Sequence, residues 1–285
     1  HAGQMKRLVA PYIAAGASLT INSGATLRVN GHTVSDGLVS GLGRVQVAAN
    51  NAVVRGQFAN LLVSGPSGTT VRLGGTTSVS GNLILRQSLD LVSNTMLVAG
   101  AVTVEATGGL IMTSPAALLD VEQSFTWSAS SASTMSAGLL CVRGRFEVRS
   151  AAAFGPTGTH TVELTGAVST LRMNAGAFHN LRLTAAEVLV ETPTPPATFA
   201  FQVNGDLTIG TATQPTRLVS PSSSVRVGGN AVLQAGSIVA LASIQIGGEL
   251  GTATLASLSA ATITAGAVTG AGTVDATELA LDSTT

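Results

Sequence analysis

The chain has 285 residues, of which 45% are hydrophobic but only 3% aromatic, and its 14 basic residues balance 14 acidic ones. This balance provides no field that would attract nucleic acid or an anionic membrane surface. The one cysteine, Cys141, excludes an internal disulfide and a cysteine-based metal cage, and we expect it to be a small buried apolar residue.

The N-terminal residues 1–17 are predicted to form a capping or contact segment. Within them MKRLVAPYIAAGA, residues 5–17, resembles a signal peptide, but Pro11 breaks its short apolar part. A start at His1 instead of methionine is what a processed piece of a longer protein would have. No run of 18 apolar residues occurs, so we expect no membrane-spanning helix.

From residue 18 onward the sequence repeats one phrase, in which two short alternating apolar runs flank a glycine. Alternation over four to seven residues, rich in β-branched side chains, predicts strands. Copies of the phrase stand at 27–35, 78–88, 96–104, 140–150, 201–210, 224–234 and 243–250. The aligned glycines are Gly31, Gly56, Gly81, Gly100, Gly144, Gly205, Gly229, Gly248 and Gly266, mostly 18 to 25 residues apart.

This period predicts the fold class. Propeller blades need about 40 residues, whereas coils of 18–25 residues suit an all-β, single parallel β-helix (β-solenoid). The chain then has about 11–14 coils over residues 18–285, right-handed by the rule for parallel crossovers. Three prolines in residues 191–198 predict a loop that leaves the solenoid there.

The phrase also predicts which residues face the core. Val79, Leu83 and Leu85 alternate and should form inward rungs that stack on neighbouring coils. We expect Gly81, Gly205 and Gly229 to occupy equivalent corners, where φ is positive or the backbone approaches closely. Asparagines after these glycines, such as Asn82 and Asn230, suggest stacked ladders at the same corners.

Residues 125–184 contain a further string of spaced aromatic, glycine and asparagine positions. They are Phe125, Trp127, Phe146, Phe154, Pro156, Gly158, Thr159, His160, Val162, Leu164, Gly166, Phe178, Asn180 and Leu181. The string resembles a repeat of large secreted or surface proteins of environmental bacteria, which look like parallel β-helix modules of adhesin-like or scaffold type. The resemblance implies that fold and role, and it carries no catalytic residues.

Histidines offer no metal motif. His1, His32, His160 and His179 lack a ligand spacing to one another or to Cys141. The sharpest candidate is His160, for which we expect a corner histidine that hydrogen-bonds the backbone, with a ligand or catalytic role as the alternative. We therefore predict no catalytic, cofactor or metal residues and no cofactor.

Acidic residues and glycine-rich turns also lack a clear catalytic pattern. Asp120 and Glu122 share a strand face and form the one close acidic pair, which is expected to lie on a solvated outer face. The segments 65–70 and 270–275 lack the lysine or third glycine of a phosphate loop and are predicted to be turns. Trp127 and Tyr12 are too few for an aromatic sugar platform.

These observations favour a structural role over catalysis. We expect an extracellular or cell-surface β-solenoid, not an enzyme, that binds copies of itself through exposed end coils, with surface polysaccharide as a second candidate partner. The alternative is a carbohydrate-active β-helix enzyme, which would gather acids and arginines in a groove over adjacent coils. Ice binding ranks last, because the threonines near residues 251–273 hold no regular Thr-x-Thr spacing.

Overall fold

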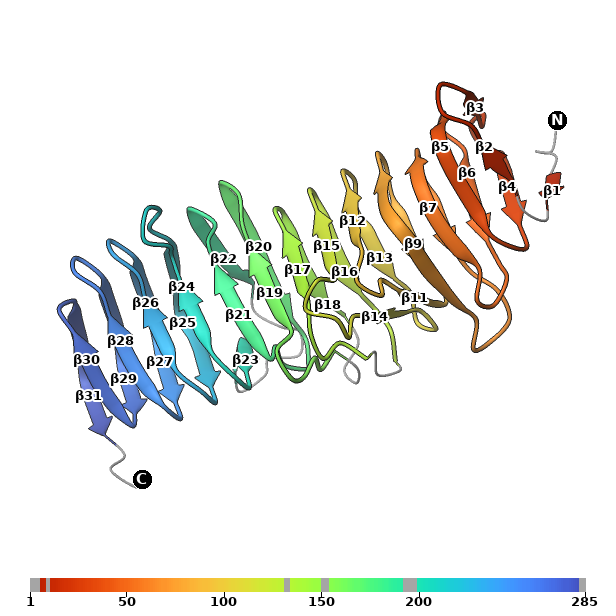
Figure 1. Cartoon of the computed structure of the whole chain (residues 1–285). Helices are drawn as coiled ribbons and strands as arrows, with labels where there is room; N and C mark the ends of the chain where they lie inside the picture. The colour runs from red at the N-terminus through yellow and green to blue at the C-terminus, as the bar shows by residue number, and fades with distance from the viewer. Residues whose placement is uncertain (1–5, 9–10, 131–133, 150–153, 192–198, 282–285) are drawn as a thin grey trace. The chain divides into compact units, whose positions relative to one another are not determined.

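The fold is a parallel β-solenoid. The computed structural model describes residues 6–8, 11–130, 134–149, 154–191 and 199–281. These residues contain β-strands and no helix, and the strands stack in parallel as a solenoid of about 13 turns (Figure 1). The predicted fold class and the expected number of coils are therefore confirmed, whereas the handedness stays a prediction.

The chain divides into two compact units, residues 1–140 and 141–285, with the boundary inside β17 (Leu139–Val142). In both units the strands belong to two parallel sheets, which we call sheet A and sheet B. Strands that follow one another along the chain mostly lie in different sheets, and the strands that pair within a sheet come from adjacent coils.

Sheet A of unit 1 runs in the order β1 (Lys6–Leu8), β4 (Thr26–Val29), β6 (Arg44–Val47), β8 (Leu61–Val63), β10 (Leu83–Leu85), β13 (Val102–Val104), β16 (Ser124–Trp127). Sheet B of unit 1 runs in the order β2 (Tyr12–Ile13), β5 (Thr33–Ser40), β7 (Val53–Phe58), β9 (Thr70–Val79), β12 (Thr95–Val98), β15 (Leu118–Val121). In addition, β3 (Ser18–Thr20) pairs with β5, and β11 (Ser88–Asp90) pairs with β9 and β14 (Gly109–Ile111).

Sheet A of unit 2 runs in the order β18 (Arg145–Val148), β20 (Val168–Met173), β22 (Glu187–Glu191), β25 (Arg217–Val227), β27 (Ile238–Ile246), β29 (Ser257–Ala265), β31 (Thr273–Leu281), and β23 (Phe201–Val203) also pairs with β25. Sheet B of unit 2 runs in the order β19 (Thr161–Leu164), β21 (Asn180–Leu183), β24 (Leu207–Ile209), β26 (Ala231–Leu233), β28 (Glu249–Thr252), β30 (Ala267–Gly270).

The core consists of in-register apolar rungs. Leu83 lies between Leu61 and Val102 on the neighbouring strands of sheet A, and the three side chains are 0–1% exposed. Val79 and Leu85 are buried in the same way. The predicted inward register is therefore confirmed, because a slip of one residue would have turned these side chains to solvent.

The prediction that Gly81, Gly205 and Gly229 occupy equivalent corners is wrong. Gly81 follows β9 and precedes β10, so it lies where the chain passes from sheet B to sheet A. Gly205 and Gly229 lie where it passes from sheet A to sheet B, and Gly56 lies inside β7. A coil has more than one kind of corner, and the same local turn serves at two of them.

Both corners nevertheless share the predicted side-chain ladder. The Asn60 Oδ1 accepts the backbone N–H of Asn82 at 2.9 Å, and the Asn82 Oδ1 accepts that of Ala101 at 2.9 Å. In unit 2 the backbone N–H of Asp206 donates to Asn180 Oδ1 (3.0 Å) and that of Asn230 donates to Asp206 Oδ1 (2.8 Å). Each oxygen thus satisfies a backbone donor that the sheet ladder leaves free at the corner.

Two of the predicted segments, residues 1–17 and 191–198, can be compared with the observed strands. Strands β1 and β2 lie within residues 1–17 and extend sheets A and B by pairing with β4 and β5. The predicted loop at 191–198 begins at Glu191, the last residue of β22, and its remainder lies outside the described residues. Among the described residues, no helix is long and apolar enough to cross a membrane.

Candidate functional site

Several charged residues form single ion pairs between adjacent coils. In unit 1 the Arg55 guanidinium lies 2.9 Å from the Asp36 carboxylate, and that of Arg86 lies 2.8 Å from Glu105. Both pairs are substantially exposed, and such pairs contribute little to stability. Their dispersed positions differ from the gathered charges that a polysaccharide-cleaving groove would need.

One larger cluster of charges does exist, on sheet A of unit 2. Glu147 on β18 lies opposite Arg172 on β20, which in turn lies opposite Glu191 on β22. Arg145 donates two hydrogen bonds to Glu191, of 2.8 and 2.7 Å, so its planar guanidinium binds that carboxylate in a bidentate manner. Arg149 lies 3.2 Å from Glu147. We call these five residues the Arg–Glu cluster.

Glu147 is the buried centre of the Arg–Glu cluster, with 6% of its surface exposed. Burial acts to raise the pKa of its carboxyl group, but the hydrogen bond from Arg149 and the positive charges of Arg149, Arg145 and Arg172 outweigh it, so the pKa lies below its ordinary value. Glu147 is therefore ionised at neutral pH. A carboxyl group in this state is suited to holding arginines and is a poor general acid.

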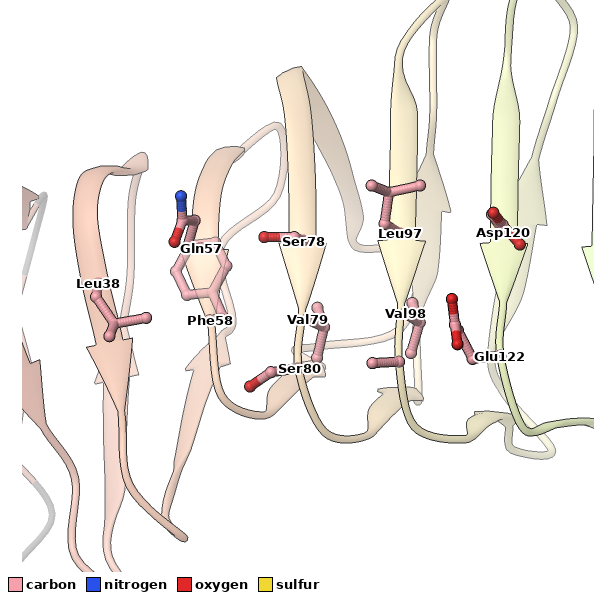
Figure 2. Close-up of a pocket in the computed structure, with 11 residues that line it drawn as sticks. Leu38, Gln57, Phe58, Ser78, Val79, Ser80, Leu97, Val98, Asp120 and Glu122 are labelled. Carbon is pink, nitrogen blue, oxygen red and sulfur yellow. The ribbon is translucent and has the colours of Figure 1, made fainter.

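A shallow groove of about 320 Å³ lies on the outer face of sheet B in unit 1 (Figure 2). Its floor is a row of outward residues on five successive strands, namely Leu38, Gln57, Ser78, Leu97 and Asp120. Leu38 and Leu97 are 45% and 41% exposed. The groove therefore combines polar side chains with two exposed apolar ones.

The acidic pair of the sequence analysis lies in this groove. Asp120 and Glu122 both line it, as Figure 2 shows, and so share one face of the sheet as predicted. Among the described residues, no arginine or lysine lines the groove. The features expected of the enzyme alternative are thus divided, because the described arginines and lysines lie outside the lining of the groove and the Arg–Glu cluster belongs to the other unit.

His160 differs from its expected role as a corner residue that bonds to the backbone. Its side chain is 0% exposed, and within the described part of the chain neither ring nitrogen has a hydrogen-bond partner. Burial lowers the pKa of the imidazole to about 4, and the charge of His179 acts in the same direction. The ring is therefore neutral at pH 7, which is the state that burial without partners requires.

The other candidates have structural positions. His32 Nδ1 accepts the backbone N–H of Val53 at 3.0 Å. Cys141, expected to be buried, is half-buried, because it lies at an outward position of β17. Trp127 is fully buried and stacks on Phe125, with ring centroids 6.2 Å apart.

Neither metal ligands nor phosphate loops emerge from the predicted motifs. Over the residues that the structure describes, no three His, Cys, Asp or Glu side chains come together as a metal site. In segment 65–70 the Thr69 N–H donates to the Pro66 carbonyl at 3.1 Å, which is a turn as predicted. Segment 270–275 bends only at residues 271 and 272, between β30 and β31, so the predicted turn is shorter than the segment.

Comparisons with models of known protein families, with curated proteins and with solved structures give no match to this chain. The resemblance of residues 125–184 to a bacterial surface repeat is therefore supported only as far as the β-solenoid fold. The function must be argued from the molecule itself.

Proposed function

We propose that this protein is a structural element of the extracellular space or the cell surface, a β-solenoid rod whose copies associate head to tail into a filament or surface fibre. A role as an adhesin stalk is the variant of this proposal in which the solenoid remains a single copy. Support comes from the repeat, from the sparse surface charges, several of which are paired, and above all from the last described coil.

The observation that carries the proposal is the exposure of core positions on β31. Leu279 and Leu281 follow the same inward rungs as Ile263 and Ala265 of β29. The two β29 residues are 0% exposed, whereas Leu279 is 49% and Leu281 57% exposed. Among the described residues β31 pairs on one side only, so an open strand edge accompanies this apolar surface. Such an end favours pairing with another strand.

The described N-terminal end of the solenoid is similarly incomplete. Leu19 and Leu27 are half-buried, although Val39 and Val45, their neighbours on the same inward rungs, are 2% and 1% exposed. Leu19 and Leu27 also line a hollow of about 320 Å³. A second copy stacked here would bury apolar surface at both ends, and because the two surfaces differ, the contact can repeat from one copy to the next.

Electron microscopy and light scattering of the purified full chain test this proposal. We expect filaments, with a mean mass that rises with protein concentration, because each added copy buries one apolar end on another. A monomer that persists at high concentration, with no filaments in the images, would contradict head-to-tail association and leave only the stalk variant.

A second candidate is a carbohydrate-active enzyme, and the Arg–Glu cluster is the observation that favours it. Three arginines and two carboxylates, on adjacent strands or directly after one, resemble the charge arrangement expected for cleavage of acidic polysaccharide. If this candidate is correct, the wild-type chain depolymerises an acidic polysaccharide. The variant Glu147→Gln, which keeps the shape of the side chain, should lose that activity.

A further inference from the structure

The first and the last described strands belong to the same sheet. At the C-terminal end the strands alternate, with β28 and β30 in sheet B and β29 and β31 in sheet A. At the N-terminal end β1 belongs to sheet A, and β2 and β3, which follow it, belong to sheet B. When a second copy stacks on the first, the sheet A strand β31 is therefore followed by another sheet A strand.

This order determines how two copies can stack, because each strand of a solenoid lies half a coil further along the stack than the one before it. If sheet A of the second copy lay over sheet A of the first, pairing of β1 with β31 would leave one empty strand position in sheet B, between β30 and β2. If sheet A of the second copy lies over sheet B of the first, β1 follows β30 and β2 follows β31 at the ordinary spacing of about 4.8 Å. The second arrangement pairs the open edges of both sheets.

The widths of the sheets at the two ends favour the same exchange. At the C-terminal end the strands β27, β29 and β31 of sheet A have nine residues each, whereas β28 and β30 of sheet B have four. At the N-terminal end sheet B is the wider one, since β5 has eight residues while β4 and β6 of sheet A have four. Exchange of the sheets sets the wide side of one end on the wide side of the other, so fewer backbone groups of β31 stay unpaired.

We infer that sheet A of one copy continues as sheet B of the next, with β31 paired in parallel with β2 and β3, and β30 paired with β1. The edges that meet are open, because among the described residues β31 pairs only with β29, and β2 and β3 pair only with β5. This inference rests on the proposed head-to-tail function and adds the geometry of the contact.

Apolar residues of the two wide edges come into register in this arrangement. Leu279 and Leu281 occupy inward positions of β31, and Leu19 occupies an inward position of β3. Pairing of β31 with β3 sets Leu279 beside Leu19 and Leu281 beside Ile21, which directly follows β3. Leu19 and Ile21 line the hollow of about 320 Å³ at this end, so the two exposed leucines would cover it.

Both wide edges are also divided into two parts. Ala276 and Leu279, two inward positions of β31, are three residues apart, so the regular alternation is interrupted between them. The facing edge is interrupted between β2 and β3 by a turn at 14–17. With Leu279 beside Leu19, the first part of β31 meets β2, where Ile13 is the inward residue and Ala276 comes beside it.

The outward residues are compatible in the same register. Glu278 comes beside Ser18 and Ala280 beside Thr20, so neither pair sets like charges together. Contact between two C-terminal ends would instead bring the exposed carboxylates of two β31 strands together. The contact between unlike ends is therefore the favoured one.

Disulfide cross-linking of assembled filaments tests the exchange of sheets. In a Cys141→Ser background, Thr20→Cys is combined either with Ala280→Cys on β31 or, as the matched control, with Thr269→Cys on β30. All three threonine and alanine positions are exposed and outward. Paired strands lie about 4.8 Å apart, within the Cα separation that a disulfide tolerates.

We expect mild oxidation to convert the variant with cysteines at 20 and 280 into a ladder of covalent multimers on a denaturing gel. The variant with cysteines at 20 and 269 should remain monomeric, because only sheet B stacked on sheet B would bring these two positions together. Ser18→Cys with Glu278→Cys is a second pair in the expected register and should cross-link as the first does.

The outcomes separate this inference from the proposal on which it rests. Circular dichroism and electron microscopy first establish that the variants are folded as β-sheet and form filaments before oxidation. Filaments in which positions 20 and 269 cross-link, or in which neither expected pair does, would overturn the exchange of sheets and leave head-to-tail association standing. A wild type that never assembles would overturn both.

Discussion

At the scale of single residues, His160 shows how a polar side chain is accommodated in this core. It immediately precedes β19 and its backbone remains bonded, with its N–H donating to the Thr157 carbonyl at 3.2 Å and its carbonyl accepting from Asn180 at 3.2 Å. The imidazole is buried without partners among the described residues, which is tolerable only while it is neutral. Acid should therefore destabilise the solenoid by protonating this residue.

We predict that unit 2 loses stability between pH 6.5 and about 4 because of His160. In this range the unfolded chain binds a proton that the folded chain does not, since burial lowers the folded pKa from 6.5 to about 4. The free energy of unfolding should fall by about 3 kcal/mol as the pH decreases. Urea titrations across this range should show a shallower loss in His160→Leu, while His32→Gln, at an exposed histidine, should retain the full loss.

At the scale of elements, the corner turns depend on a glycine followed by an asparagine or aspartate. A Cβ on Gly229 would lie 2.5 Å from Asp206 Oδ1 and 2.8 Å from the Gly205 carbonyl oxygen. The backbone angle φ of Gly229 is not positive, so the glycine is needed for the close approach of the previous coil and not for a left-handed backbone. The side chain of one coil thus determines which residue the next coil can place above it.

We predict that Gly229→Ala lowers the free energy of unfolding by about 1–3 kcal/mol, because the added methyl group must displace the Asp206 carboxylate or the backbone. Chemical denaturation monitored by circular dichroism measures this change. Gly155→Ala provides the matched control in the same unit, since a Cβ there has no neighbour within 4 Å and the φ is not positive. Equal losses in the two variants would contradict the close-approach explanation.

At the scale of the whole molecule, charge is arranged along the stack. Ion pairs join adjacent coils in both units, which is how a chain with no net charge avoids rows of like charges at the short spacing between coils. The described ends break this rule in opposite directions, because no described cation pairs with Asp275 or Glu278 on β31 and no described carboxylate pairs with Arg28 on β4. Assembly should therefore combine a salt-sensitive and a salt-resistant contribution.

We predict that sodium chloride weakens filament formation several-fold between about 0.05 and 0.5 M, because screening at these concentrations reduces the attraction between the end charges. Sodium sulfate should reverse the loss at higher concentration, because it strengthens the burial of Leu279 and Leu281. Sedimentation of filaments over the two salt series measures both effects. Assembly that only strengthens with sodium chloride would show that the end charges contribute nothing.

The sequence by itself determined the strands, the inward rungs and the corner ladders. Alternation of apolar residues places Val79, Leu83 and Leu85 on one face whatever the neighbouring coil contains, because side chains alternate strictly along a strand. The Gly–Asn phrase predicted the ladder because each step of the ladder is local: one side-chain oxygen accepts one backbone N–H. These features recur from coil to coil and can be recognised without knowing which coils are neighbours.

Only the tertiary structure decided which residues meet across coils. The Arg–Glu cluster joins Glu147, Arg172 and Glu191, which are 25 and 19 residues apart, and the coils vary too much in length for such a pairing to be read from spacing. The same variation hid the fact that Gly81 and Gly229 lie at different corners. The burial of His160 also depends on how the coils stack, because enclosure of a side chain is a property of its neighbours.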